Sequence, residues 1–191
     1  MTALDQAIEV HVRSYFREHR VEKRVWRVGP MHRLAPTFSV LEVSPGPKSA
    51  LWNYVSAGAG SLVSEEKESV EFILVAPLQI DRAVELVTMA AWYHAKENLG
   101  IGHTLPIGEP WMEGSSCDHF LVSLPYPFGP EFEVVARAAK KTRILWLLPI
   151  TKAERDYKIA HGQDALERLL ESNAIQHWVS DRASVVPPAA G

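Results

Sequence analysis

The segment from Arg143 to Ser172 reads RILWLLPITKAERDYKIAHGQDALERLLES. Its first six residues are large and mostly apolar and stop at Pro149, a pattern that indicates a buried strand. Thr151 followed three residues later by Glu154 is the capping-box signature of a helix N-terminus. The leucine-rich stretch that follows has helical spacing. We therefore expect one strand and two helices here, over residues 143–148, 151–161 and about 163–172.

Five more short apolar runs, each bounded by Pro, Gly or polar residues, lie N-terminal to this segment. They are rich in β-branched and aromatic side chains and are short enough to be strands. The connections between the first four are short, which favours an antiparallel meander over βαβ crossovers. The expected strands cover residues 25–28, 37–43, 51–56, 71–76 and 119–124.

Two more helices are indicated before the C-terminal pair. Thr2 and Asp5 form a second capping-box pattern, and apolar residues then recur at helical spacing, which predicts a helix over about 3–20. Residues 81–98 are apolar nearly all round, as in a helix that is buried on most sides. Gly100 is its expected stop.

The composition is that of a soluble globular domain. The chain has 191 residues, of which 47% are hydrophobic and 23% charged. Its net charge is −3, from 20 basic and 23 acidic residues, so no overall basic excess favours direct nucleic-acid or membrane binding. The single cysteine, Cys117, the absence of a signal-peptide pattern and the lack of a ~20-residue apolar span predict a cytoplasmic protein.

Residues 100–118 carry no strand or helix pattern, and loops of that length are commonly functional. Trp111 and Met112 lie in the middle, a composition typical of the centre of a protein-binding surface. The alternative is that Trp111 folds back into the core. The candidate partner-binding residues are Trp111 and Met112 as anchors, Glu109, Glu113 and Asp118 as rim charges, and His103.

The same segment contains the residue types of an active site. His103, Cys117, Asp118 and His119 could serve as metal ligands or as an acid–base set. Their spacing matches no zinc motif, and the chain has neither a G-x-S-x-G motif nor a phosphate-binding glycine loop. We therefore expect no catalytic residue, metal or cofactor, and keep an enzyme with a metal or Cys/His site in residues 103–119 as an alternative. A third alternative is a self-associating regulatory domain that pairs through an open edge strand, for which residues 51–56 are the candidate.

Several segments together resemble the bacterial suppressor-of-fused domain family. They are FSVLEV from Phe38, WNYVSAG from Trp52, the helix from Val84 to His94, GIGHTLPIG from Gly100, and LLPITKAERDYK from Leu147. The similarity extends over about residues 25–172. It implies an α+β fold, a single-domain sandwich with a mixed, mostly antiparallel sheet packed by helices. The domain would cover residues 1–179, and residues 180–191 would form a flexible tail.

The resemblance also implies a function. The animal relative is a two-domain regulator that binds a transcription-factor peptide, and bacterial members are regarded as immunity proteins for polymorphic toxins or as partner-binding domains. We therefore expect a non-enzymatic, cytoplasmic protein-binding domain, most plausibly an immunity protein that masks a toxin. The acidic rim of the 100–118 loop would suit a basic toxin domain such as a nuclease.

Overall fold

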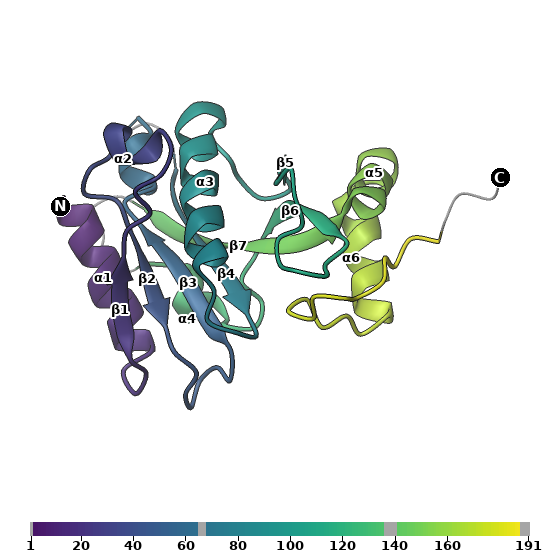
Figure 1. Cartoon of the computed structure of the whole chain (residues 1–191), viewed down its shortest axis with the longest axis horizontal. Helices are drawn as coiled ribbons and strands as arrows, with labels where there is room; N and C mark the ends of the chain where they lie inside the picture. Colours follow the sequence, from purple (N-terminus) through teal and green to yellow (C-terminus); the bar gives the residue numbers. More distant parts are fainter. Residues whose placement is uncertain (1, 65–67, 136–140, 188–191) are drawn as a thin grey trace.

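A seven-stranded sheet with the order β1-β2-β3-β4-β7-β6-β5 organises the computed structural model, which describes residues 2–64, 68–135 and 141–187 (Figure 1). The strands are β1 (Val21–Arg24), β2 (Ser39–Val43), β3 (Trp52–Ala57), β4 (Ser69–Ala76), β5 (Thr104–Pro106), β6 (Cys117–Ser123) and β7 (Thr142–Thr151). The helices are α1 (Ala3–Tyr15), α2 (Met31–Leu34), the 3-10 turn η1 (Gly60–Leu62), α3 (Asp81–Glu97), α4 (Pro130–Glu133), α5 (Lys152–His161) and α6 (Gln163–Ser172).

The sheet is mixed and mostly antiparallel, as expected. Strands β1 to β4 form an antiparallel meander, and β5, β6 and β7 are also paired antiparallel. Among the described strands only the β4–β7 pair is parallel, and the chain between these two strands passes through α3 and the β5–β6 pair. Because β3 lies between β2 and β4, residues 51–56 are not an open edge. The edges of the described sheet are β1 and β5.

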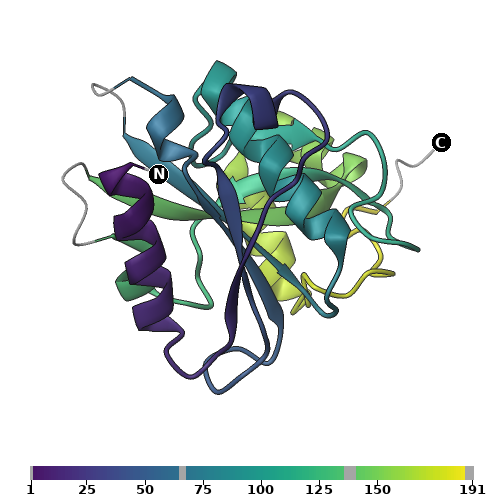
Figure 2. The same ribbon diagram turned by 60° about the vertical axis from the view of Figure 1, so that its left-hand side comes forward.

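Helices cover both faces of the sheet (Figures 1 and 2). On the first face, α3 and α2 pack on side chains such as Tyr54 and Phe72 in one core cluster. On the second face, α1, α4 and α6 pack on side chains such as Val55 and Ile73 in another. The alternation of side chains along each strand separates these two clusters. The helix over residues 81–98 is therefore the expected central helix, and no described helix is long and apolar enough to cross a bilayer.

Both capping boxes are confirmed. The Thr2 hydroxyl accepts from the Asp5 N–H at 3.1 Å, and the Asp5 carboxylate accepts from the Thr2 N–H at 2.7 Å. Thr151 and Glu154 do the same at the start of α5. Residue 98 ends α3, not Gly100, because Asn98 adopts the left-handed conformation with φ 50°.

Two N-terminal expectations need correction. Helix α1 ends at Tyr15 and not near residue 20, because His19 turns toward the β2–β3 connection and its Nδ1 lies 2.7 Å from the Ser44 carbonyl. The first strand is Val21–Arg24 and not residues 25–28. This strand is charged and lies at an edge, so it carries no apolar signal, and Arg24 forms an ion pair with the buried Glu42 at 2.7 Å.

The last strand also exceeds its expected length. Strand β7 runs through Pro149 to Thr151. Pro149 lies opposite Phe120 of β6, beyond the last pairing with β4 at Trp146. The Pro149 carbonyl accepts a 2.8 Å hydrogen bond from Arg182, so the backbone polar groups of this residue point away from the neighbouring strands. The N–H that proline lacks would therefore not have taken part in strand pairing.

At least part of the chain beyond residue 179, which was expected to be a flexible tail, packs against the domain. Arg182 is only 7% exposed and forms an ion pair with Glu154 at 2.7 Å. The Val185 N–H donates to the same carboxylate at 3.0 Å. Residues 180–187 therefore pack against the start of α5, while residues 188–191 lie outside the described residues.

Candidate functional site

The loop between β5 and β6 is held by backbone hydrogen bonds to the strand that follows it. The Ile107 N–H donates to the Asp118 carbonyl at 2.9 Å, and the Trp111 N–H donates to the Cys117 carbonyl at 3.0 Å. The expected unbroken loop over residues 100–118 is thus wrong, because β5 and the start of β6 lie within it. The true loop, residues 107–116, is anchored at both ends.

Trp111 is fully buried, at 0% exposure. It belongs to the core cluster of the α3 face, together with Leu105, Ile107 and Cys117. The prediction of an exposed anchor is therefore wrong for this residue, and the alternative of a side chain folded into the core is right. Burying a large indole stabilises the loop more than exposing it would, and it fixes the position of the residues beside it.

Met112 and Glu113 lie beside a surface hollow of about 580 Å³. Leu78, just before α3, and Arg82, in the first turn of α3, also line the hollow. Leu78 is 62% exposed. Glu109 lies at its margin, with a carboxylate oxygen 3.9 Å from Arg82. We call this the loop surface and define it by Leu78, Ile80, Arg82, Glu109, Pro110, Met112 and Glu113.

The two remaining candidate residues lie elsewhere. His103 borders a separate hollow of about 450 Å³ next to β5, with Tyr93 and Lys158 on its walls. Asp118 is half-buried on β6, and its carboxylate lies 2.7 Å from Nδ1 of His119. The structure thus brings together Met112, Glu109 and Glu113, but not all six residues, around one surface.

Of the four residues that could have formed an active site, only Asp118 and His119 are seen in contact in the described structure, and His103 borders a separate hollow. Within the part of the chain that the structure describes, no three His, Cys, Asp or Glu side chains are grouped as metal ligands would be. Cys117 is 1% exposed, and burial raises the pKa of its thiol, which is the opposite of an activated nucleophile. Within the described residues, the structure therefore supports neither a metal site of this kind nor Cys117 as an activated nucleophile.

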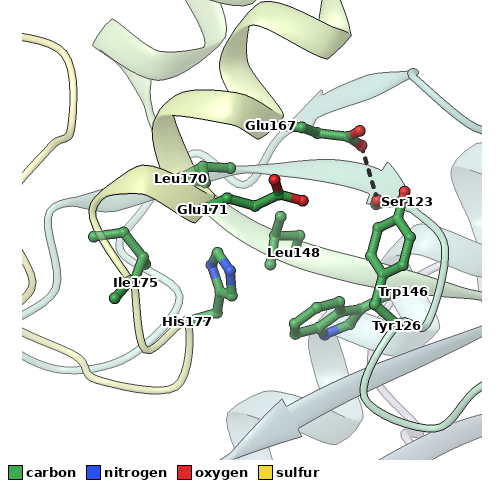
Figure 3. A pocket seen from close by; sticks show the side chains of 10 residues that line it. Ser123, Tyr126, Trp146, Leu148, Glu167, Leu170, Glu171, Ile175 and His177 are labelled. Atoms are coloured by element: carbon green, nitrogen blue, oxygen red, sulfur yellow. Dashed lines mark hydrogen bonds between the residues drawn. The ribbon is translucent and has the colours of Figure 1, made fainter.

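A further pocket, of about 210 Å³, lies on the second face of the sheet (Figure 3). We call it the α6 pocket. Its walls come from the end of β6 and the segment after it, from β7, from α6 and from the segment after α6: Ser123, Tyr126, Trp146, Leu148, Glu167, Leu170, Glu171, Ala174, Ile175 and His177.

Some polar groups of the α6 pocket form hydrogen bonds, and others have no hydrogen-bond partner among the described residues. The Ser123 hydroxyl and the Gln163 amide donate to Glu167 at 3.3 and 2.7 Å. Trp146, which is 4% exposed, meets His177 edge to face at 5.3 Å. Trp146 Nε1 and His177 Nδ1 are buried and have no hydrogen-bond partner among the described residues.

The electrostatics of this pocket are acidic. Burial, together with the nearby Arg182 charge, lowers the pKa of His177 to about 4, so the imidazole is neutral at pH 7. Burial also raises the pKa of Tyr126, and the carboxylates of Glu167 and Glu171 raise it further. Sequence analysis missed this site, although the spacing of Asp164, Glu167 and Glu171 on one helix face was visible.

Comparisons with known proteins agree on the fold. The family model for the suppressor of fused protein (SUFU) matches residues 35–183. The crystal structure of a SUFU homologue from Neisseria gonorrhoeae is 32% identical, with a TM-score of 0.85, and the match covers 97% of this chain and 98% of that chain. No curated protein sequence matches the chain.

Two more distant structures share the fold. The Sufu–Fu complex is matched with 14% identity and a TM-score of 0.67, over 95% of this chain and 91% of that chain. Drosophila Suppressor of Fused is matched with 14% identity and a TM-score of 0.68, over 94% of this chain. This chain spans about half of the Drosophila protein, since the match covers 50% of it.

Proposed function

Because the chain belongs to the suppressor of fused family, we propose that it is a non-enzymatic protein-binding domain and that the loop surface is its interface. The observation that carries the proposal is the exposure of Leu78, at 62%, beside Met112 and Pro110 on one hollowed surface. A structure with the same fold is described as the Sufu–Fu complex, which supports protein binding as the shared type of activity.

The loop surface has the composition of an interface. Its centre is apolar, with Leu78, Ile80 and Met112, and charged side chains surround that centre. Interfaces that bind tightly commonly have such an apolar centre within a polar rim, and a few central side chains contribute most of the affinity. Truncation of a central anchor costs about 2 kcal/mol or more of binding free energy.

Trp111 supports this surface from below. Its indole is buried under the loop, and its backbone N–H donates to the Cys117 carbonyl at 3.0 Å. A loop held in place before binding loses less conformational entropy when a partner docks. Trp111 therefore acts through the position of Met112 and not through contact with the partner.

A narrower form of the proposal is that the partner is a toxin domain, masked in the cytoplasm. The exposed carboxylates of Glu109 and Glu113 would attract a basic partner such as a nuclease, and would increase its association rate most at low salt. This narrower role requires that the captured partner is toxic when expressed alone and harmless when expressed with this chain.

The test is capture of partners from a lysate of the native organism with the tagged chain, followed by mass spectrometry. Leu78→Asp and Met112→Asp place a charge in the apolar centre, and Val10→Asp makes the same kind of change on α1, on the other face of the sheet, where Val10 is 45% exposed. We expect one stoichiometric partner with the wild type and with Val10→Asp, and its loss with the other two variants. Equal capture by all four proteins would show that the interface lies elsewhere.

A further inference from the structure

Three carboxylates form a stripe along α6 beside the α6 pocket. Asp164, Glu167 and Glu171 are spaced i, i+3 and i+7, so they share one side of the helix. None of the three forms an ion pair with any residue that the structure describes, and the hydrogen bonds to Glu167 come from the neutral side chains of Ser123 and Gln163. The negative charge at this pocket is therefore not compensated within the described structure.

This arrangement is unfavourable for the helix itself. Glu167 and Glu171 are four residues apart, and like charges at that spacing destabilise a helix. Glu171 lies in the last turn, where the helix dipole disfavours negative charge, and that turn has no basic residue. A cation bound beside Glu167 and Glu171 would offset both penalties.

Apolar surface lies directly below these carboxylates (Figure 3). Leu148 and Leu170, each 4% exposed, form the floor with Ile175, and Trp146 adds an aromatic wall. The volume of about 210 Å³ is below the roughly 300–1,000 Å³ of pockets for drug-sized ligands, so it fits a group the size of one side chain. An occupant of this pocket needs an apolar stem and a charged end.

Neighbouring groups favour a cation at that end. Arg182 is bound to Glu154 by both terminal nitrogens, at 2.7 and 2.8 Å, and His177 is neutral at pH 7. The rings of Trp146 and Tyr126, which line the pocket, are faces on which ammonium groups bind. The indole N–H of Trp146, buried and without a described partner, fits an occupant that also brings a carbonyl oxygen.

We propose that the α6 pocket binds a lysine-type group, in which a four-carbon stem packs on Leu148, Leu170 and Ile175 and the ammonium lies between Glu167 and Glu171. Lysine side chains commonly bury the stem and keep the charged end at a polar rim. The group can come from free lysine or from a lysine within a polypeptide chain. Because the pocket lies on the opposite face of the sheet from the loop surface, this inference is independent of the proposed interface.

Isothermal titration calorimetry at low salt and pH 7.5 tests the proposal. The probe is Nα-acetyl-L-lysine methylamide, and Nα-acetyl-L-norleucine methylamide, which has the stem without the ammonium, is the control ligand. We expect the lysine probe to bind at least about tenfold more tightly, the effect of one hydrogen bond to a charged group. Added salt should reduce this difference.

Variants locate the binding. The double variant Glu167→Gln with Glu171→Gln should lose the preference for the lysine probe. Glu18→Gln with Glu97→Gln removes two exposed carboxylates outside the pocket and should keep the preference. Circular dichroism of both double variants checks that they are folded.

Equal binding of the two probes would overturn the proposal, and so would an unchanged preference in the folded Glu167→Gln, Glu171→Gln variant. Absence of binding by the wild type would do so as well. Free L-lysine as a third probe separates the sources. Binding equal to the blocked probe identifies the free amino acid, and much weaker binding identifies a lysine within a polypeptide.

Discussion

Replacement of Arg182 by methionine is expected to destabilise the protein strongly. The guanidinium donates to Glu154 at 2.7 and 2.8 Å and to the Pro149 carbonyl at 2.8 Å. Glu154 is 0% exposed and Arg182 is 7% exposed, so both charges lie out of water. Methionine keeps the apolar stem but leaves the carboxylate of Glu154 without its cation.

The expected loss is about 3–5 kcal/mol, the usual effect of removing one partner from a buried ion pair. That is a large part of a total stability of about 5–15 kcal/mol. Urea unfolding followed by tryptophan fluorescence measures it. Arg168→Met, an exposed position on α6, is the control and should change stability by no more than about 0.5 kcal/mol.

The pH dependence makes this prediction sharper. Burial alone would raise the pKa of Glu154, but its hydrogen bonds and charge contact with Arg182 outweigh burial and hold the pKa below its ordinary value. In the wild type the pair therefore adds stability above the unfolded pKa of Glu154, and this stability is lost as the pH falls through the lowered folded pKa. In Arg182→Met burial is less opposed, so the folded pKa rises and the ionised carboxylate becomes unfavourable as the pH rises.

The penalty of Arg182→Met should accordingly be larger at pH 8 than at pH 4.5. The double variant Glu154→Gln with Arg182→Met should be more stable at pH 8 than Arg182→Met alone, because it has no buried unpaired charge. A loss below about 1 kcal/mol, or a penalty that grows toward acid pH, would refute the reasoning.

The remaining predictions concern Trp111, Glu71 and His177. Trp111→Ala should cost about 3–5 kcal/mol of unfolding free energy, and Trp111→Phe clearly less, both measured by urea unfolding. Burial raises the pKa of Glu71 to about 7, so the stability that Glu71 contributes is full below its unfolded pKa and is lost as the pH rises through about 7. Glu71→Gln should therefore flatten the dependence of stability on pH between pH 5 and pH 8, measured in thermal melts. The ring protons of His177 should titrate in NMR spectra with a midpoint near pH 4, and a midpoint near 6.5 would contradict its burial.

Features that depend on neighbours in the sequence were predicted well. The capping boxes at Thr2–Asp5 and Thr151–Glu154 predicted the starts of α1 and α5, because the two partners of each box are three residues apart. The continuous apolar pattern of residues 81–98 predicted α3, and the run from residue 143 predicted most of β7. The resemblance to the suppressor-of-fused family predicted the mixed, mostly antiparallel sheet.

Strand β1 shows where local signals fail. Its residues, Val21 to Arg24, are half-buried or exposed and include three charges, so no apolar alternation indicates a strand. The pairing with β2 and the ion pair from Arg24 to Glu42 hold it in the sheet. Both interactions join segments about 20 residues apart, and their formation depends on the folded sheet.

The amino-acid sequence by itself thus determined the positions of the main helices, most of the strands and the family. Only the tertiary structure decided that Trp111 is core while Leu78 and Met112 lie at the surface, and that the acidic stripe of α6 borders an apolar pocket. The physical reason is the range of the interactions. Helix caps and hydrophobic periodicity act within a few residues, whereas burial and the electrostatics of a site depend on side chains that the fold brings together from distant parts of the chain.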